Sequence, residues 1–360
     1  MAIIKLEYQH FRNLVSTRLN PVSGFNYIIG PNASGKTSLL EAIYYLSRAN
    51  SFRTHLTAHL ISQGHCELTV YGEVHDSGRS SHIGISRSKT VSQIRIDGKS
   101  AQRTSELVSL LPLTLLETGL HTIIEGGPEN RRKFLDWGVF HVEQHYRDNW
   151  IRFRRALMQR NAAIKAGWTR KNVAQWDTEL VQASDIITDH RRRYLANLAH
   201  TVAFISSRFP GLGHIDLSYV QGWKQGLSYA EYLQQQLESD IERGFTQYGP
   251  HRADIRISTE TGSAKDVLSR GQQKLCMASL IISQCKQLQN TGREVVILVD
   301  DLAAELDKEN RIALLSALSD SNAQVFISGT DSSIVEEYRI SGSKVFHVEQ
   351  GNVRETGTVE

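Results

Sequence analysis

Cysteine is scarce in this chain of 360 residues, which contains only Cys66, Cys276 and Cys285. An odd number of cysteines without paired spacing fits neither a disulfide framework nor a zinc site. We therefore expect a reducing, cytoplasmic environment. The chain also lacks an apolar run of membrane-spanning length, and the charged residues Glu7 and Arg12 come too early for a signal-peptide core. We expect no membrane association.

Excess charge is also lacking, because the net charge is only +3 and does not by itself identify a partner. The apolar fraction of 40% and the charged fraction of 22% are ordinary for a globular protein. No internal repeat or low-complexity segment is visible, and the length favours about two domains.

A phosphate-binding pattern, G-x-x-x-x-G-K-[ST], is matched at every fixed position by Gly30, Pro31, Asn32, Ala33, Ser34, Gly35, Lys36 and Thr37. Residues 25–29 before it predict a buried strand, and apolar residues recur at helical spacing after it, from Ser38 onward. In such a P-loop, backbone N–H groups and the helix N-terminus surround phosphates. We expect Lys36 to neutralise the β- and γ-phosphates, Thr37 to hold Mg²⁺ and Ser38 to lie in the same site. The protein should bind a nucleoside triphosphate.

The first and last thirds of the chain mix strands with helices. In the first third we expect an antiparallel layer beside the nucleotide core, built from residues 2–8, 67–74, 82–86 and 91–96, then a helix at residues 105–111 and a strand at residues 113–116. In the last third we expect strands at residues 254–258, 294–299, 324–328 and 344–348, and helices at residues 269–288 and 308–318. This alternation predicts a sheet continued from the first third.

Between these parts, residues 129–247 follow a helical period and predict an inserted arm. Residues 131–193 carry 14 Lys and Arg against 7 Asp and Glu, with aromatic residues among them. One interpretation is a nucleic-acid surface, on which Arg152, Arg154 and Arg155 contact the backbone. The other is a set of solvated helix faces with the aromatic rings in the core.

Two further stretches favour nucleotide chemistry. Ser269 and Gln272 have the S-x-x-Q spacing of a capping box that opens a helix and leaves N–H groups for an anion. The apolar strand at residues 294–299 ends in Asp300, a candidate Mg²⁺ ligand opposite Thr37. Asp301 would orient or deprotonate the attacking water. Arg12 either reaches bound phosphate or is merely solvated.

The combination resembles the ATP-binding-cassette (ABC) ATPases, in which L-S-G-G-Q opens a helix. The corresponding residues are Leu268, Ser269, Arg270, Gly271 and Gln272, so only Arg270 departs from that motif. In that superfamily the helix end contacts the γ-phosphate held by a second subunit. The resemblance therefore implies that Ser269, Arg270, Gly271 and Gln272 bind nucleotide across a homodimer interface. The segment from residue 302 to Asp307 resembles the loop that crosses this interface, which places Asp307 at the nucleotide.

Spacing discriminates within the superfamily, because 233 positions separate Lys36 from Ser269. Transporter ATPases have a much shorter insertion, and chromosome proteins of the SMC type have far longer coiled coils. The intermediate arm is similar to that of the RecF family of bacterial DNA replication and repair proteins. Finer matches run nearly end to end: residues 126–128, 131–138, 249–254, 268–272 and 300–307.

This resemblance implies an α/β fold: an ABC-type P-loop ATPase head, with a mixed sheet and an antiparallel β layer, plus a helical arm. Residues 1–125 and 248–360 would form the head, and residues 126–247 the arm. It further implies ATP and Mg²⁺ as cofactors, weak DNA-dependent ATPase activity and ATP-dependent dimerisation on DNA at gaps. It implies work with RecO and RecR to place RecA on single-stranded DNA, and a part in replication restart and the SOS response.

Departures from the superfamily predict slow hydrolysis. Asp301 stands where a glutamate is usual, and no histidine follows the next strand, where Thr330 lies. A transporter subunit is disfavoured by the long arm. An ATP-regulated nuclease is disfavoured because the chain ends soon after the last expected strand, and a GTPase because no N-K-x-D motif occurs.

Overall fold

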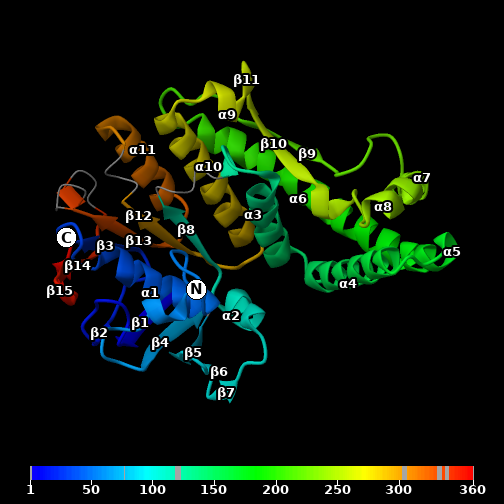
Figure 1. The fold of residues 1–360 in the computed structure, drawn as a ribbon. Helices are drawn as coiled ribbons and strands as arrows, with labels where there is room; N and C mark the ends of the chain where they lie inside the picture. The colour runs from blue at the N-terminus through cyan, green and yellow to red at the C-terminus, as the bar shows by residue number, and fades with distance from the viewer. Residues whose placement is uncertain are drawn as a thin grey trace. The chain divides into compact units, whose positions relative to one another are not determined.

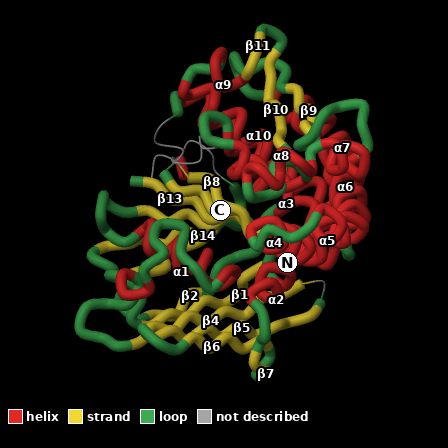
Figure 2. Tube along the Cα trace, turned by 45° about the vertical axis from the view of Figure 1, so that its right-hand side comes forward, coloured by secondary structure: helices red, strands yellow, loops and turns green. Residues whose placement is uncertain are grey.

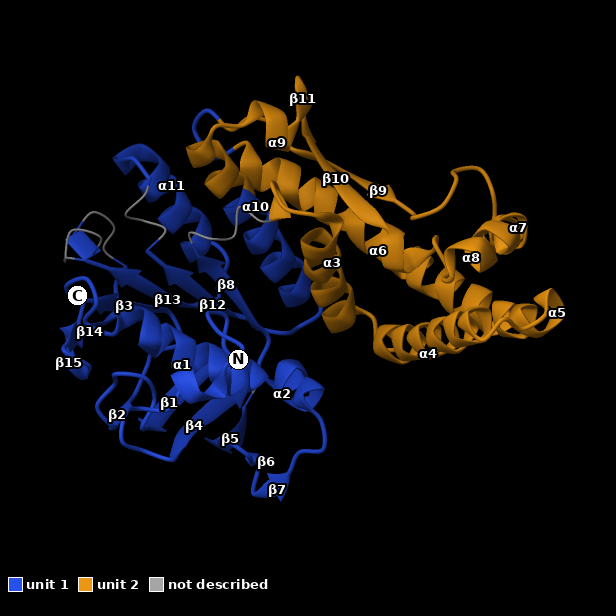
Figure 3. Cartoon of the chain, in the orientation of Figure 1, with its two compact units in different colours: residues 1–120, 208–211, 277–360 blue, residues 121–207, 212–276 orange. Residues whose placement is uncertain are grey.

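The structure is a computed structural model that describes residues 2–76, 78–117, 123–301, 306–330, 335–336 and 340–359 (Figure 1). The chain divides into two compact units (Figure 3). The first unit comprises residues 1–120, 208–211 and 277–360, and the second comprises residues 121–207 and 212–276. No helix among the described residues is long and apolar enough to cross a membrane.

The first unit contains a six-stranded sheet in the order β15-β14-β3-β13-β12-β8. Its five parallel strands are β3 (Phe25–Ile29), β8 (Leu113–Glu117), β12 (Val296–Asp300), β13 (Gln324–Gly329) and β14 (Lys344–Glu349). The edge strand β15 (Asn352–Thr358) runs antiparallel to β14 and was not expected from the sequence. The predicted continuity of the sheet is confirmed, because β3 from the first third pairs with β13 and β14 from the last third.

The predicted antiparallel layer is also present, in the order β2-β1-β4-β5-β6-β7. Its strands are β1 (Ala2–Gln9), β2 (Thr17–Leu19), β4 (Glu67–Asp76), β5 (Arg79–Ser88), β6 (Ser92–Ile96) and β7 (Lys99–Ser100). Helix α1 (Lys36–Arg48) lies between the two sheets (Figure 2). Leu39, Leu40, Ile43 and Leu46 are all buried there, as expected for a helix covered on more than one face.

Two further helices of the first unit are α2 (Thr104–Leu110) and α11 (Lys308–Ser319). Helix α10 (Arg270–Gln289) contains the division between the units, since its residues 270–276 belong to the second unit and residues 277–289 to the first.

The second unit is helical, as predicted for the arm, but it also contains a small sheet. Its helices are α3 (Pro128–Val142), α4 (Tyr146–Lys165), α5 (Arg170–Val173), α6 (Asp177–Ser206), α7 (Tyr229–Gln235), α8 (Leu237–Arg243) and α9 (Ala264–Val267). Helices α4 and α6 run side by side over much of their length (Figure 1). The sheet has the order β11-β10-β9, from β9 (Asp216–Val220), β10 (Asp254–Thr259) and β11 (Gly262–Ser263).

The boundaries of the units differ from those expected from the sequence. Residues 248–276, which we expected in the ATPase head, group with the helical arm, and residues 208–211 group with the first unit. The reason is pairing within the second unit. Strand β10 pairs with β9 from Asp254 to Ser258, and Arg131 of α3 forms a bidentate ion pair with Asp254 at 2.7 and 2.9 Å.

Two arginines of the basic segment form the polar core of the second unit rather than its surface. The Arg160 side chain is fully buried and donates to Asp177, Asp240 and Thr246 at 2.9, 2.8 and 2.6 Å. Arg191 is equally buried; its Nε donates to the Asp136 carboxylate at 2.9 Å, and its Nη2 lies 2.7 Å from the same oxygen as an ion pair. Removing one partner of such a pair leaves the other charge buried and unpaired, which lowers the free energy of unfolding by about 3–5 kcal/mol.

Some aromatic residues of the same segment lie in the core as well. Tyr146 and Phe153 are buried, and the Arg191 guanidinium lies over the Trp150 ring, 5.2 Å from its centroid, which is within cation–π distance. Trp168 is the exposed exception, at 49%. The interpretation as core rings is therefore confirmed for Tyr146 and Phe153.

The buried His251 should make the second unit sensitive to acid. Burial is the main cause that lowers the pKa of its imidazole to about 4; Arg252, Arg132 and Arg191 add to this effect, and the Thr246 carbonyl opposes it. Since the folded pKa lies below the unfolded value, the contribution to stability is complete above the unfolded pKa and is lost as the pH falls through the folded one.

We expect this single group to cost about 2 kcal/mol of unfolding free energy between about pH 7 and about pH 5. Urea unfolding of the wild type and of His251→Gln at both pH values measures the difference. The exposed His200, changed to Gln, is the control. An equal pH dependence in wild type and His251→Gln would contradict the assignment.

Candidate nucleotide-binding site

The phosphate-binding loop of the first unit follows β3 and leads directly into α1. Gly35 has a φ of 119° and forms the N-cap of the helix, a conformation that glycine adopts without strain. The Lys36 ammonium is buried and donates to the carbonyl oxygens of Gly30 and Pro31 at 2.8 and 3.0 Å. The predicted strand, loop and helix are therefore all present.

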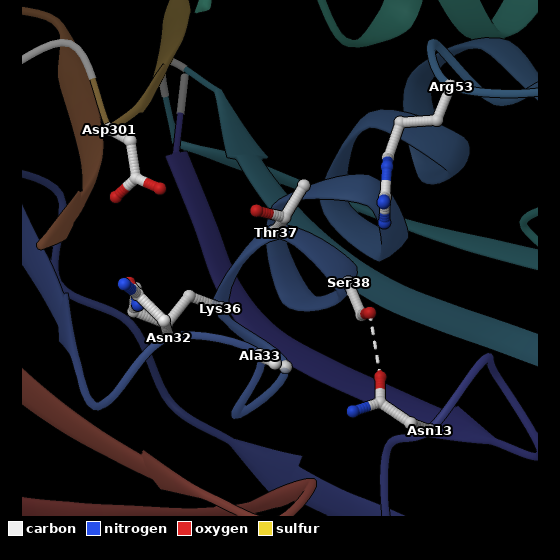
Figure 4. Close-up of a pocket in the computed structure, with 9 residues that line it drawn as sticks. Asn13, Asn32, Ala33, Lys36, Thr37, Ser38, Arg53 and Asp301 are labelled. Carbon is white, nitrogen blue, oxygen red and sulfur yellow. Dashed lines mark hydrogen bonds between the residues drawn. The ribbon is translucent and has the colours of Figure 1, made fainter. Parts of the chain in front are cut away.

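A cavity of about 340 Å³ opens at this loop (Figure 4). It is lined by Asn13, Asn32, Ala33, Gly35, Lys36, Thr37, Ser38, Arg53 and Asp301. Six of these residues were assigned to the nucleotide from the sequence as P-loop or adjacent positions, and Asp301 was assigned as the catalytic carboxylate. The cavity is thus walled by loop amides, two cations and one carboxylate.

Asp300 lies at the carboxyl end of β12, next to the P-loop helix. Its Oδ1 atom accepts hydrogen bonds from the Thr37 hydroxyl at 3.1 Å and the Ser328 hydroxyl at 2.8 Å. Burial is the main cause that raises the pKa of Asp300, with the Asp301 charge adding to it, while Ser328, Thr37 and Arg53 lower it.

The residues present fit an Mg²⁺ ion. Adjacent ligands of an octahedral Mg²⁺, each at about 2.1 Å from the metal, lie about 3.0 Å apart. The Thr37 Oγ1 and Asp300 Oδ1 atoms are 3.1 Å apart, and hydroxyl and carboxylate oxygens are the donors that this ion prefers. A metal there would also relieve the desolvation that raises the pKa of Asp300.

Strand β12 ends at Asp300, and the backbone turns at the next residue, Asp301. Its φ of 50° is left-handed, a conformation that aspartate tolerates better than most residues. Its N–H donates to the Ser328 hydroxyl at 2.9 Å, which holds the turn. Figure 4 shows the Asp301 carboxylate and the Arg53 guanidinium on either side of Thr37. The position of Asp301 suits a group that orients water at the phosphate chain.

Sequence reasoning missed four residues of this site. Asn13, in the segment after β1, lines the cavity. Arg53 follows α1 in an irregular segment that no motif covers, yet it lines the cavity. Ser328 is the next-to-last residue of β13 and follows three apolar residues, so this small polar residue was the available signal. Glu117 is in register with Asp300 on the neighbouring strand, and burial followed by the Asp300 charge raises its pKa.

Arg12 forms a different contact from the one expected. Its guanidinium makes a bidentate ion pair with the fully buried Glu41, both hydrogen bonds being 2.7 Å long. The Ser51 hydroxyl donates to the same carboxylate, and Arg53 lies 4.0 Å from it. Arg12 does not line the cavity, so its contact with nucleotide stays a prediction.

The signature residues lie in the second unit, and their predicted capping box is confirmed. The Ser269 N–H donates to the Gln272 side chain at 2.9 Å, and the Gln272 N–H approaches the Ser269 hydroxyl at 3.4 Å. Ser269 and Arg270 are exposed, and a side-chain carbon at Gly271 would meet nothing within 4 Å. The corner is open to another molecule.

Asp307 caps α11 by accepting from the Asn310 N–H at 2.9 Å, and this bond is the main cause that lowers its pKa. Residues 302–305 of the expected crossing loop lie outside the described residues. Thr330, the residue in place of the usual histidine, is exposed just beyond β13.

Known proteins match this chain over nearly its whole length. The family model described as the RecF/RecN/SMC N terminal domain matches residues 2–354. The DNA replication and repair protein RecF of Shewanella baltica is 38% identical over 356 residues, which are 98% of this chain and 99% of that protein. The chain belongs to the RecF family. RecF of Vibrio vulnificus is 37% identical over 358 residues, covering 99% of this chain and 100% of that protein.

Solved structures agree with this family. The structure described as the recombination mediator protein RecF-ATPrS in the RecFOR pathway has a TM-score of 0.84 at 25% identity and covers 99% of this chain and 98% of its own. An Smc head bound to the C-winged helix domain of ScpA has a TM-score of 0.63 at 15% identity, over 98% of this chain and 96% of its own, and shows the fold alone. This RecF-family protein is thus an ATPase of the ABC/SMC class that acts in DNA replication and repair.

Replacing Arg53 with alanine should weaken ATP binding. The guanidinium lies in the cavity beside the P-loop, and a hydrogen bond to a charged group contributes about 1.5–3 kcal/mol, so we expect the dissociation constant to rise about tenfold or more. Calorimetric titration with ATP and Mg²⁺ measures it. Arg95→Ala on β6, outside the cavity, is the control, and unchanged affinity in Arg53→Ala would remove Arg53 from the site.

Proposed function

We propose that this protein is an ATP-dependent DNA-binding switch of recombinational repair, which dimerises on DNA at gaps when it is loaded with ATP. With RecO and RecR it would help to load RecA on single-stranded DNA, and it would take part in replication restart and the SOS response. The RecF structures described as recombination mediators of the RecFOR pathway, with ATP or its analogue, support this role by family.

The single observation that carries the proposal is that the phosphate-binding groups are divided between the two units. The first unit supplies the P-loop, Asp300 and Asp301 around one cavity. The second unit supplies a capped helix start at Ser269, and a side-chain carbon added at Gly271 in its first turn would meet nothing within 4 Å. Such a helix end attracts anions. A second copy would bring its Ser269 corner to the γ-phosphate held by the first.

Each residue then has a distinct task at the phosphates. Lys36 would exchange its carbonyl partners for β- and γ-phosphate oxygens, and Thr37 and Asp300 would hold an Mg²⁺ ion, which would supply positive charge there. Asp301 accepts a hydrogen bond from the attacking water and orients it. Arg53 contributes a second positive charge from the opposite side of Thr37 (Figure 4).

Hydrolysis by this arrangement should be slow. The Asp301 side chain is one methylene shorter than glutamate, and its left-handed backbone is anchored through Ser328. Correct placement of a general base to within hydrogen-bond reach governs its contribution. ATP would therefore act as the timer of a clamp more than as fuel for movement.

ATP should double the mass of the protein in solution. Size-exclusion chromatography with light scattering should give the 40.5 kDa chain alone and about twice that mass with ATP and Mg²⁺. Ser269→Arg should abolish the increase because the long cation blocks the open corner. Ser263→Arg, at another exposed serine of the second unit, is the matched control. ATP binding without any ATP-dependent increase in mass would refute the dimer.

We infer that Arg154 and Arg155 are better candidates for DNA contact than Arg152. Arg152 is already paired with Glu179 at 2.8 and 3.1 Å. Arg154 and Arg155 are exposed on α4 and have no hydrogen-bonding or ionic partner among the described residues. Phosphates would gain more from these two unneutralised charges than from Arg152.

Neutralising Arg154 and Arg155 together as glutamines should weaken duplex binding and lower the salt slope by about 2, because about two fewer counterions are released. Fluorescence anisotropy over a series of salt concentrations, with ATP present, measures both quantities. Arg152→Gln should change the slope less. An unchanged slope in the double variant would assign these arginines to a solvated helix face.

A further inference from the structure

Strand β14 and the turn that follows it lie against the P-loop. Strand β14 runs parallel to β3 in register up to His347 opposite Ile29, so that both strands deliver the chain to the same edge of the sheet. The next residues therefore meet. A side-chain carbon at Gly30 would lie 2.1 Å from the Val348 carbonyl oxygen. No residue other than glycine fits at the start of the P-loop while β14 stays in place.

The turn between β14 and β15 forms hydrogen bonds to this region through its backbone. Gln350 and Gly351 both have left-handed φ values, 46° and 81°, as in a two-residue type I′ hairpin. The Gly351 N–H donates to the Ser34 carbonyl of the P-loop at 2.8 Å, and the Gly351 carbonyl accepts from the Val15 N–H at 2.9 Å. One residue thus connects the P-loop to the segment that follows β1.

Gly351 also leaves no room for a side chain. A carbon added there would lie 1.9 Å from the Asn13 carbonyl oxygen. Because this is a backbone atom, a change of side-chain rotamer cannot relieve the clash. Asn13 itself lines the nucleotide cavity, and its side chain accepts from the Ser38 hydroxyl at 2.8 Å (Figure 4). Displacing Asn13 would disturb the wall of the cavity as well as the hairpin.

The hydrogen bond to Ser34 has a consequence for phosphate binding. The C=O and N–H of one trans peptide point in opposite directions. Because Gly351 holds the Ser34 carbonyl toward the hairpin, the Gly35 N–H points away from it. Gly35 lines the cavity, so this orientation favours an N–H available to phosphate.

We propose that Gly351 is a positioning residue of the ATPase and that the β14–β15 turn is a supporting wall of the P-loop that sets its affinity for phosphate. The inference rests on nucleotide binding at the P-loop and does not depend on dimerisation or DNA. It predicts in turn that bound nucleotide stabilises the hairpin, because the two share the Ser34 peptide.

The chain offers a matched control turn. Asp97 and Gly98, between β6 and β7, have φ values of 50° and 78°, close to those of Gln350 and Gly351. A side-chain carbon at Gly98 would meet nothing within 4 Å, and the turn does not line the cavity. Gly98→Ala therefore imposes the same left-handed backbone strain without the collision.

Gly351→Ala should raise the ATP dissociation constant and the KM about tenfold or more while kcat changes little, and Gly98→Ala should leave all three near wild type. Titration with ATP and Mg²⁺ and steady-state hydrolysis measure these, and circular dichroism establishes that both variants are folded. Equal ATP affinity in folded Gly351→Ala and Gly98→Ala would overturn the proposal. A wild type that binds no ATP would instead overturn the assigned nucleotide site.

Hydrogen exchange on the wild type tests the same idea without a variant, in case Gly351→Ala does not fold. Peptides covering residues 344–358 should exchange more slowly with ATP and Mg²⁺ than without them, as should P-loop peptides. Peptides covering residues 92–100 should not change. Protection of the P-loop with no change in residues 344–358 would overturn the coupling.

Discussion

The hydrogen bond between Thr37 and Asp300 joins residues 263 positions apart, and the geometry of the nucleotide site depends on it. It exists because β3, β12 and β13 are parallel neighbours whose carboxyl ends meet at one edge of the sheet. Ser328, near the end of β13, completes the arrangement, because its hydroxyl donates to the Asp300 carboxylate and accepts from the Asp301 N–H. Any change that shifted these strands by one residue would turn the carboxylates to the other face of the sheet.

The parts of the fold that could be predicted from the sequence are those whose signal is local. The sequence predicted a buried strand at residues 25–29, and all five residues of β3 are buried. The P-loop was predicted from the fixed pattern that follows them. Strand β9 and the hairpin strand β15 were not predicted, because β9 is short and lies among helical patterns, and the mostly polar β15 is buried on few residues. Their existence depends on partner strands far away in the chain.

The same distinction applies to functional residues. Lys36, Thr37 and Asp300 were identified because motif and strand end specify their chemistry, and the structure brings them together. Arg53 and Gly351 belong to no motif: Arg53 lines the cavity, and Gly351 contacts the P-loop through a 2.8 Å backbone hydrogen bond. The arm shows the opposite error, because a basic composition overstated the exposed charge. Arg160 and Arg191 are buried against carboxylates.

The segment after β1 and the turn between β14 and β15 therefore both support the P-loop region. In the segment after β1, Asn13 accepts from Ser38 at the start of α1 and Val15 donates to Gly351; in the segment after β14, Gly351 donates to Ser34 of the P-loop. Backbone hydrogen bonds of this kind fix peptide orientation, which side-chain contacts alone would leave adjustable. A loop that must present several N–H groups to one phosphate chain gains affinity when those groups are oriented before binding, because less ordering is then required at that moment. The support comes from strands already fixed by the sheet, so the orientation of the loop is coupled to the stability of the sheet as a whole.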